Sequence, residues 1–384
     1  MLIVADENMP FAEAAFRTLG DVRLMPGRAM TREAVRDAEI LAVRSVTKVN
    51  RELLEGTAVR FVGTATIGTN HVDEEYVKET GIAFTSAPGC NANSVSEYIA
   101  AALLVLSGRE GERLAGKSIG IVGVGNVGSR VAAKAEALGM RVVLNDPPLQ
   151  RKTGDEKYRP IEEIPGCDVV TLHVPLEKDG PDPTYHLADD DFIAAMKPGA
   201  ALINSSRGAV VDNPALLTAL ESEQLGAAVL DVWEGEPLIL PGLLKRVALG
   251  TPHIAGYSLD GKINGTTMVY EAACRFLGEE PTWKASDEDA PVAVPELQLD
   301  VSDRAVEDIL REAVLAVYPI ERDDAALRKV LDLPRDAQGN FFDNLRKNYP
   351  LRREFPNTRV RFSGGKPSDP LTVALRHLGF RVRD

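Results

Sequence analysis

The chain has 384 residues, 44% of them hydrophobic and 26% charged, with a formal net charge of −13. This length exceeds what one ordinary hydrophobic core supports, so two or three domains are expected. The negative charge, with no long basic run against it, disfavours nucleic acid and anionic membranes as partners. Cys90, Cys167 and Cys274 lie far apart and outside metal-ligand spacing, which argues against disulfides and a metal site. With neither a secretory leader nor a membrane span expected, the sequence predicts a cytoplasmic multidomain protein.

Short apolar runs alternate with helical patterns from the start of the chain. The runs predict buried strands at Leu2–Ala5, Ile40–Val43, Arg60–Val62 and Ile82–Thr85, and the helical patterns lie at Pro10–Leu19 and Arg51–Leu54. Such alternation is typical of a parallel sheet with helices on both faces. An Ala-rich helix is expected from about Ser94 to Leu106.

A second alternating series begins at Ser118. Its expected elements are a strand at Ser118–Val122, a helix at Gly128–Leu138 and strands at Arg141–Leu144, Asp168–Leu172, Ala201–Asn204, Ala227–Leu230 and Val247–Leu249. A helix from about Gly261 to Leu277 follows, and the Pro-containing segment Gly278–Pro295 predicts a linker. A helix at Ser302–Tyr318 and short strands at Arg359–Phe362 and Phe380–Arg383 complete the pattern. We therefore expect an α/β protein with two doubly wound parallel-sheet domains and a small C-terminal α+β domain.

The string from Gly123 to Gly128 matches G-x-G-x-x-G, a weak signal when it stands alone. Here it follows an apolar strand, opens a helix and precedes a second strand that ends at Asp146. This is the context of a dinucleotide site, because the glycines let the backbone approach a pyrophosphate at a helix N-terminus. Asp146 can accept hydrogen bonds from ribose hydroxyls and would repel a 2′-phosphate, which indicates NAD. The expected cofactor residues are Gly123, Gly125, Asn126, Val127, Gly128 and Asp146.

Polar clusters follow three later strands, where ligands of parallel sheets bind. They are Asn204–Gly208, Asp231–Pro237 and Thr251–Tyr257. Oxidation of a 2-hydroxy acid requires a base, a carboxylate that holds the base and a cation for the acid group. His253, Glu236 and Arg207 supply these groups, with Arg207 able to bind a carboxylate through two parallel hydrogen bonds. Each residue alone has an ordinary structural explanation, and their joint occurrence behind a nucleotide motif favours catalysis.

Five strings together resemble the D-isomer-specific 2-hydroxyacid dehydrogenases. They are Gly123–Gly128, Leu172–Leu176, Asn204–Gly208, Leu230–Pro237 and Thr251–Gly256. The resemblance implies Arg207, Glu236 and His253 as the catalytic set, and Pro175, Asp231 and Gly256 as further cofactor residues. It also implies a discontinuous substrate domain of residues 1–95 and 256–280, an NAD domain of residues 96–255 and a dimerisation domain of residues 286–384.

Further strings are similar to the branch of the family that acts on a four-carbon hydroxy-acid phosphate. They are Ala5–Asn8, Val43–Thr47, Ser86–Asn91, Pro252–Ser258 and Phe342–Phe355. By this likeness Ser45, Thr66 and Tyr257 contact substrate. The phosphate needs cationic groups as well, and we expect them from Arg44 and from Arg346 or Arg352–Arg353 of a homodimer joined through its C-terminal domain.

Two alternatives stay open. The chain could be another 2-hydroxyacid dehydrogenase, such as a phosphoglycerate dehydrogenase, or an NAD-sensing scaffold or corepressor that keeps the fold for partner binding. His71 is interpreted as structural or as supporting the substrate residues from behind, because its loop faces the substrate cleft in the family. His173 follows a strand and is interpreted as packing or capping, and His186 and His377 have no constellation of other polar residues.

Overall fold

The computed structural model describes residues 1–285 and 290–383. The chain forms two compact units, Met1–Ala92 with Tyr257–Pro291, and Asn93–Gly256 with Val292–Asp384. Of the expected linker Gly278–Pro295, residues 286–289 lie outside the described part, and so does the start of the expected dimerisation domain. Within the described residues, no helix is long and apolar enough to cross a membrane.

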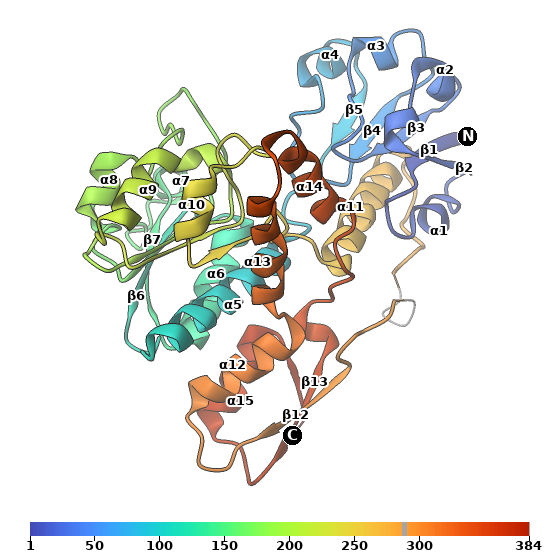
Figure 1. The fold of residues 1–384 in the computed structure, drawn as a ribbon. Coiled ribbons are helices and arrows are strands. Elements are labelled where there is room, and N and C mark those ends of the chain that lie inside the picture. Colours follow the sequence, from blue (N-terminus) through green and yellow to red (C-terminus); the bar gives the residue numbers. More distant parts are fainter. Residues whose placement is uncertain (286–289, 384) are drawn as a thin grey trace. The chain divides into compact units, whose positions relative to one another are not determined.

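The first unit is built on a five-stranded parallel sheet of order β2-β1-β3-β4-β5 (Figure 1). The strands are β1 (Leu2–Asp6), β2 (Asp21–Met25), β3 (Ile40–Val43), β4 (Phe61–Thr64) and β5 (Ala83–Thr85), and the helices are α1 (Ala12–Phe16), α2 (Arg32–Val35), α3 (Arg51–Leu54), α4 (Glu74–Glu79) and α11 (Leu259–Leu277). Successive side chains enter different cores, since Ile3 packs with α1 and α11 whereas Val4 packs with α2, α3 and α4. Helices therefore cover both faces of this sheet.

The second unit contains a six-stranded parallel sheet of order β11-β10-β9-β8-β6-β7. Its strands are β6 (Ser118–Val122), β7 (Arg141–Asn145), β8 (Val169–Leu172), β9 (Ala201–Asn204), β10 (Ala227–Leu230) and β11 (Leu249–Gly250), and its helices are α5 (Ala92–Glu110), α6 (Asn126–Ala137), α7 (Pro147–Thr153), α8 (Asp190–Ala195), α9 (Asn213–Glu221) and α10 (Pro241–Arg246). One core lies between the sheet and α8, α9 and α10, with Leu202 and Leu230 among its members.

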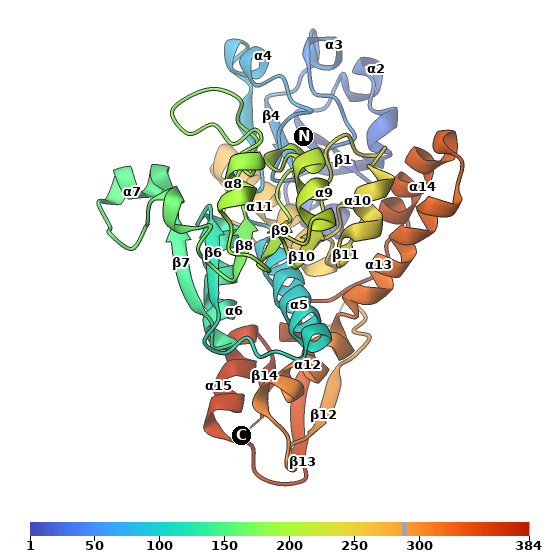
Figure 2. The ribbon, with the colours of Figure 1, turned by 60° about the vertical axis from the view of Figure 1, so that its left-hand side comes forward.

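Residues 292–383, here called the tail, belong to this second unit. They form β12 (Glu296–Asp300), α12 (Val306–Val317), α13 (Ile320–Arg328), α14 (Arg335–Lys347), β13 (Arg359–Ser363), α15 (Asp369–Leu378) and β14 (Arg381–Val382). The strands pair in parallel in the order β12-β13-β14, α15 packs on α6, and α13 lies beside β11 (Figure 2). Leu327, Val330 and Phe342 are buried in the same core as Leu202, so the tail helps to complete the core of the six-stranded sheet.

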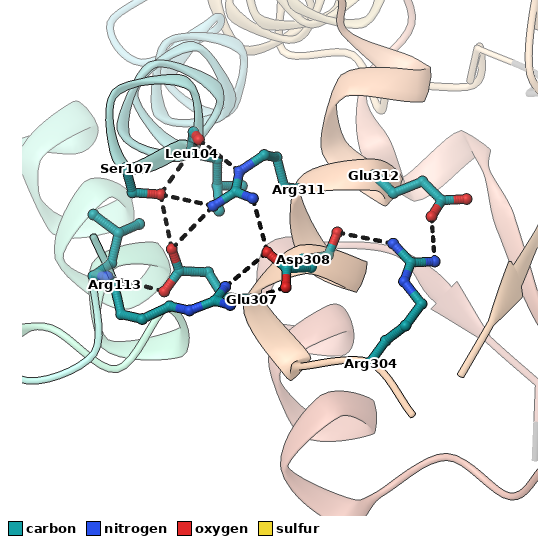
Figure 3. A network of polar contacts seen from close by, with 9 residues as sticks. Leu104, Ser107, Arg113, Arg304, Glu307, Asp308, Arg311 and Glu312 are labelled. Carbon is teal, nitrogen blue, oxygen red and sulfur yellow. Dashed lines mark hydrogen bonds and ion pairs between the residues drawn. The ribbon is translucent and has the colours of Figure 1, made fainter. Parts of the chain in front are cut away.

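Helix α5 is buried along most of its length, and the tail holds its C-terminal end (Figure 3). Arg311 of α12 donates to the carbonyl of Leu104 at 2.9 Å and to Ser107 Oγ at 3.1 Å. Glu307 accepts from Ser107 Oγ at 2.7 Å and from the backbone N–H of Leu114 at 2.9 Å. A cation here also suits the negative end of the helix dipole.

The expected fold class is confirmed: two parallel α/β sheets and a small C-terminal sheet-and-helix module. Strands β3, β6, β9 and β10 have the bounds that their apolar runs predict. The sequence did not predict β2, because three of its five residues are exposed and its apolar pattern is therefore weak. Such exposure is expected of a strand at the edge of a sheet. The boundaries expected at residues 95, 256 and 286 remain predictions, while the contacts above join the tail to the second unit.

Candidate active site

The three polar clusters of the sequence lie at one edge of the six-stranded sheet. β9, β10 and β11 are neighbours and run in parallel, so their carboxyl ends share one side. Arg207 follows β9, Glu236 follows β10 and His253 follows β11. The fold therefore brings the loops of all three expected catalytic residues to the same edge.

His253 and Glu236 form a close pair within that edge. Nδ1 of His253 lies 2.5 Å from Oε1 of Glu236, and the side chains are 30% and 25% exposed. Burial opposes ionisation of Glu236, but the hydrogen bond and charge of His253, with smaller contributions from Trp233 N–H and Arg346, bring its pKa below the ordinary value. A carboxylate that stays ionised beside an imidazole orients it and stabilises its protonated form.

Asp231, which directly follows β10, holds the backbone around His253. His253 has a φ of 57°, a left-handed conformation that costs free energy in a non-glycine residue. Its N–H donates to the carbonyl of Asp231 at 2.7 Å. The Asp231 carboxylate accepts from the N–H groups of Ile254 at 2.7 Å and Ala255 at 2.9 Å, and from Thr251 Oγ1 at 2.6 Å. Asp231 thus organises the loop that carries His253, a role that its sequence position alone did not reveal.

Arg207 lies in a loop that closely approaches the Glu236 loop. A Cβ atom at Gly208 would lie 2.0 Å from the carbonyl oxygen of Trp233, so only glycine fits there. Asn204 donates to the carbonyl of Arg207 at 2.9 Å and fixes the turn. Arg207 is half-buried, and its Nη1 donates to the Ser206 carbonyl at 2.8 Å.

The glycine-rich loop has the shape that a dinucleotide requires. Gly123 has a φ of 85°, and a Cβ there would lie 2.5 Å from the carbonyl oxygen of His173. A Cβ at Gly128 would lie 2.0 Å from the Gly123 carbonyl oxygen, whereas Gly125 faces open space. Gly125 caps α6, which begins with Asn126 and Val127, so their N–H groups belong to its open first turn. The residues present therefore fit the phosphates of NAD.

Asp146 lies at the end of β7 beside this loop. Its two oxygens accept from the N–H groups of Val124 at 2.8 Å and Leu149 at 2.9 Å. Each carboxylate oxygen keeps a further lone pair, so ribose hydroxyls can still donate to it. Pro175 is exposed, its carbonyl accepts from Thr184 Oγ1 at 2.6 Å, and Gly256 lies three residues after His253, between β11 and α11. Cofactor contacts of Pro175, Asp231 and Gly256 stay predictions.

The expected substrate residues Arg44, Ser45, Thr66 and Tyr257 belong to the first unit. Thr66 Oγ1 donates to the Gly68 carbonyl at 3.1 Å and lies 2.8 Å from Thr64 Oγ1. Lys262 Nζ lies 5.4 Å from the ring centroid of Tyr257. Burial, followed by the charge of Arg44, lowers the pKa of Lys262. Arg44 and Lys262 thus form a pair of basic side chains. The sequence did not single out Lys262, because one lysine in a helical pattern does not indicate a binding site.

The tail arginines differ in what they contact. Arg346 lies close enough to Glu236 for its charge to act on that carboxylate. Arg352 and Arg353 are 5% and 6% exposed, and each donates to a group inside the second unit, Arg352 to the Ala255 carbonyl and Arg353 to Asn357 Oδ1. A contact of either arginine with a substrate phosphate stays a prediction.

His71, His173 and His186 each have a polar partner, which for His71 is Thr64, whose Oγ1 lies 3.0 Å from Nε2 of His71. His186 lies between Glu234 at 2.8 Å and Asp212 at 3.3 Å, an arrangement that sequence spacing did not show. His173 Nε2 lies 3.0 Å from Thr171 Oγ1, and burial lowers the pKa of His173 to about 3. His173 is therefore neutral near pH 7. Across residues 1–285 and 290–383, no group of three or more His, Cys, Asp or Glu side chains is arranged to hold a metal ion.

Comparisons with known proteins cover both parts of the chain. Residues 102–255 match the model described as D-isomer specific 2-hydroxyacid dehydrogenase, NAD binding domain, and residues 291–379 match a domain of unknown function (DUF3410). The chain is 47% identical to the erythronate-4-phosphate dehydrogenase of Yersinia enterocolitica, with 100% of each chain covered. It is 48% identical to the erythronate-4-phosphate dehydrogenase of Cronobacter sakazakii, covering 100% of this chain and 98% of that one.

A solved structure matches a shorter part. The D-lactate dehydrogenase of Aquifex aeolicus, in complex with NAD and lactic acid, has a TM-score of 0.56 at 26% identity. The match covers 72% of this chain and 95% of that one. The two erythronate-4-phosphate dehydrogenases thus resemble this chain over its whole length, whereas the D-lactate dehydrogenase structure leaves more than a quarter of this chain unmatched.

Proposed function

Because this chain belongs to the D-isomer-specific 2-hydroxyacid dehydrogenase family, we propose that it oxidises the C2 hydroxyl of 4-phospho-D-erythronate with NAD. The product is 2-oxo-3-hydroxy-4-phosphobutanoate, and the reaction belongs to pyridoxal phosphate biosynthesis. The cofactor is NAD, as in the matched NAD-binding domain and in related structures that contain it.

One observation carries the chemical part of this proposal. His253 and Glu236 lie 2.5 Å apart at the sheet edge that also carries the Arg207 loop. A base, a carboxylate partner and a cation for the acid group are the components that oxidation of a 2-hydroxy acid needs. A scaffold that only senses NAD has no use for this set.

The chain's own residues then have distinct roles. Arg207 binds the substrate carboxylate and draws electron density from the C2 oxygen. His253 accepts the hydroxyl proton as the C2–H bond breaks and the C2 carbonyl forms, and Glu236 stabilises the resulting positive charge. NAD, when bound by the residues around Gly123–Gly128 and Asp146, supplies the acceptor for the hydride from C2. The step balances, because His253 takes the hydroxyl proton and the C2 hydrogen leaves with its electron pair as the hydride.

The phosphate end of the substrate requires a second set of residues. We assign it to Arg44 and Ser45, with Thr66, Tyr257 and Arg346 as further substrate contacts. The charge of Arg44 helps to lower the pKa of Lys262, which supports this assignment, because two nearby cations are stabilised by an anion that lies between them.

The remaining proposals concern assembly and location. We propose a cytoplasmic homodimer joined through residues 286–384, with no nucleic-acid or membrane partner. The exposed residues of the tail sheet include Glu296 on β12, which pairs with Arg361 on β13 at 2.9 Å, and Arg359 on β13. A second copy would therefore meet exposed charges of both signs on this sheet. Sedimentation equilibrium of the full chain measures the mass, and a monomer at all concentrations contradicts the dimer.

A substrate panel tests the activity directly. Purified protein is incubated with NAD and, separately, with 4-phospho-D-erythronate, D-erythronate, 3-phosphoglycerate and D-lactate, and formation of reduced cofactor is followed by absorbance. We expect the highest kcat/KM with 4-phospho-D-erythronate. A higher value with 3-phosphoglycerate selects the alternative dehydrogenase, and NAD binding without reduction by any of the four acids selects the scaffold.

A further inference from the structure

Residues Arg352–Phe355 carry charged side chains into the interior of the second unit. Arg352 is 5% exposed and Glu354 6% exposed. A buried charge is costly unless its partners lie inside the protein, so the contacts of these side chains show what the segment holds in place.

Arg352 contacts the loop that carries His253. Its Nη2 donates to the carbonyl of Ala255 at 2.8 Å and to the carbonyl of Ser94 at 3.4 Å. Its guanidinium lies 4.2 Å from the ring centroid of Tyr318, itself 1% exposed. One planar side chain thus connects the His253 loop, the start of α5 and the tail.

The same tail segment is fixed to α5 by carboxylates. Glu354 accepts from Ser94 Oγ at 2.7 Å and from Asn93 Nδ2 at 2.6 Å. Glu97 of α5 accepts from the N–H of Phe355 at 2.8 Å. Arg352 therefore projects from a rigidly held backbone, which lets it hold a neighbouring loop in turn.

Ala255 is held from two directions. Its N–H donates to Asp231, and its carbonyl accepts from Arg352, two residues beyond His253. We propose that Arg352 is a positioning residue for the general base: by holding the Ala255 carbonyl against α5, it keeps His253 at the distance and angle to Glu236 that proton transfer requires. The effect on catalysis rests on the function proposed above, whereas the effect on the loop does not.

The other end of α5 offers a matched control. Arg311 also comes from the tail, is partly buried, and donates to an α5 carbonyl, that of Leu104 (Figure 3). Its remaining partners are Ser107, Glu307 and Asp308, none of them in the His253 loop. Both arginines fix the tail to α5, but Arg352 alone of the two contacts Ala255.

Hydrogen exchange tests the loop without any substrate. Arg352→Met and Arg311→Met proteins are compared with wild type by mass spectrometry of peptides that cover residues 252–257 and 104–114. We expect faster exchange of residues 252–257 in Arg352→Met only, because the Ile254 and Ala255 amides lose their fixed geometry to Asp231. Faster exchange of residues 104–114 is expected in Arg311→Met only. Equal exchange of residues 252–257 in Arg352→Met and wild type overturns the proposal.

Turnover tests the consequence for catalysis. Arg352→Met should lower kcat by about 10- to 100-fold through misplacement of the base, with the Kd for NAD changed less than about twofold. Arg311→Met should keep kcat near wild type. Arg352→Lys keeps the charge beside Glu354 and should restore part of kcat; if Arg352→Met does not fold, Arg352→Lys and Arg311→Lys replace the pair in both measurements. Equal kcat losses at the two positions overturn the proposal.

The two measurements separate this inference from the proposed function. If wild type fails to oxidise 4-phospho-D-erythronate, the proposed substrate is wrong, and kcat is measured with the hydroxy acid that the panel selects. The exchange result stands in either case, because it requires no substrate.

Discussion

Two carboxylates of the second unit, Glu236 and Glu97, are both largely removed from water, yet their surroundings shift their pKa values in opposite directions. The hydrogen bond and charge of His253 outweigh burial and lower the pKa of Glu236. Burial, followed by the charge of Glu354, raises the pKa of Glu97 well above its ordinary value, although Arg352 and Lys134 oppose the shift. Glu236 keeps a quarter of its side chain exposed, whereas Glu97 has none.

The difference separates two uses of charge in one fold. Glu236 and His253, at the carboxyl edge of the sheet, keep some access to solvent, and their charges can act on a ligand. Groups beneath the tail have only protein partners, and their charges can act only on the position of other residues. Substitutions in the two clusters should therefore differ in what they change, which the following predictions test.

The largest effect is expected at His253. His253→Ala removes the base and should lower kcat by on the order of 10² to 10⁴, while the Kd for NAD stays close to wild type. Steady-state kinetics and cofactor titration measure the two quantities. Near-normal turnover across the pH range would show that another group removes the proton.

Arg207→Lys should have the next largest effect. An ammonium cannot reproduce the two parallel hydrogen bonds of a guanidinium, so kcat/KM should fall by about 10- to 100-fold. The KM for the hydroxy acid should rise and kcat should fall. Arg17→Lys is the matched control, because Arg17 is exposed and pairs with Glu13. This variant should leave KM and kcat unchanged.

Asp146 should set the choice of cofactor. A 2′-phosphate would meet its carboxylate, so kcat/KM with NAD should exceed that with NADP by at least about tenfold. Asp146→Asn keeps an oxygen for one backbone N–H and should narrow this ratio. Equal efficiency with the two cofactors in wild type contradicts the assignment.

Lys262 should give a smaller, pH-dependent effect. Since burial and Arg44 lower its pKa, Lys262 loses its charge at a lower pH than a solvated lysine. Binding of the substrate phosphate is helped below that pKa, and the help is lost as pH rises through it. KM should therefore rise by roughly three- to fivefold in the alkaline range. Lys262→Arg should abolish this rise of KM, because arginine keeps its charge at alkaline pH. An unchanged rise of KM in this variant would show that Lys262 is not the group that helps to bind the substrate phosphate.

Glu97→Gln should affect turnover least. The amide oxygen of Gln can accept from Phe355 N–H as Glu97 does, so kcat should stay within about twofold of wild type. Because the pKa of Glu97 is raised, its contribution to stability is present at acidic pH and is lost as pH rises through that pKa. Glu97→Gln should flatten this part of the stability curve in chemical denaturation. A large loss of kcat without a loss of stability would place Glu97 in the catalytic machinery.

The sequence predicted what local pattern encodes. The strands of the six-stranded sheet have apolar, β-branched runs, and Gly123–Gly128 combines composition with context, so the sheet and its glycine loop were expected. Polar residues after adjacent strands predicted the edge that holds Arg207, Glu236 and His253, because parallel topology brings strand ends together.

What sequence could not show depends on residues far apart in the chain. Arg352 reads as one basic residue in a basic segment, and only the folded chain places it on Ala255, 97 positions earlier. Likewise, Phe342 lies in a mainly polar helix, and its burial in the core of the six-stranded sheet follows from the path of the tail. Periodicity contains no information about such partners.

The central claim is that a hydride leaves C2 of a phosphorylated hydroxy acid. It is tested most directly with 4-phospho-D-erythronate deuterated at C2 and, separately, at C3, followed by mass spectrometry of the reduced cofactor. The account predicts deuterium in the reduced cofactor from the C2-labelled substrate only. Deuterium transferred from the C3-labelled substrate, or reduced cofactor that contains no deuterium with either, would contradict it.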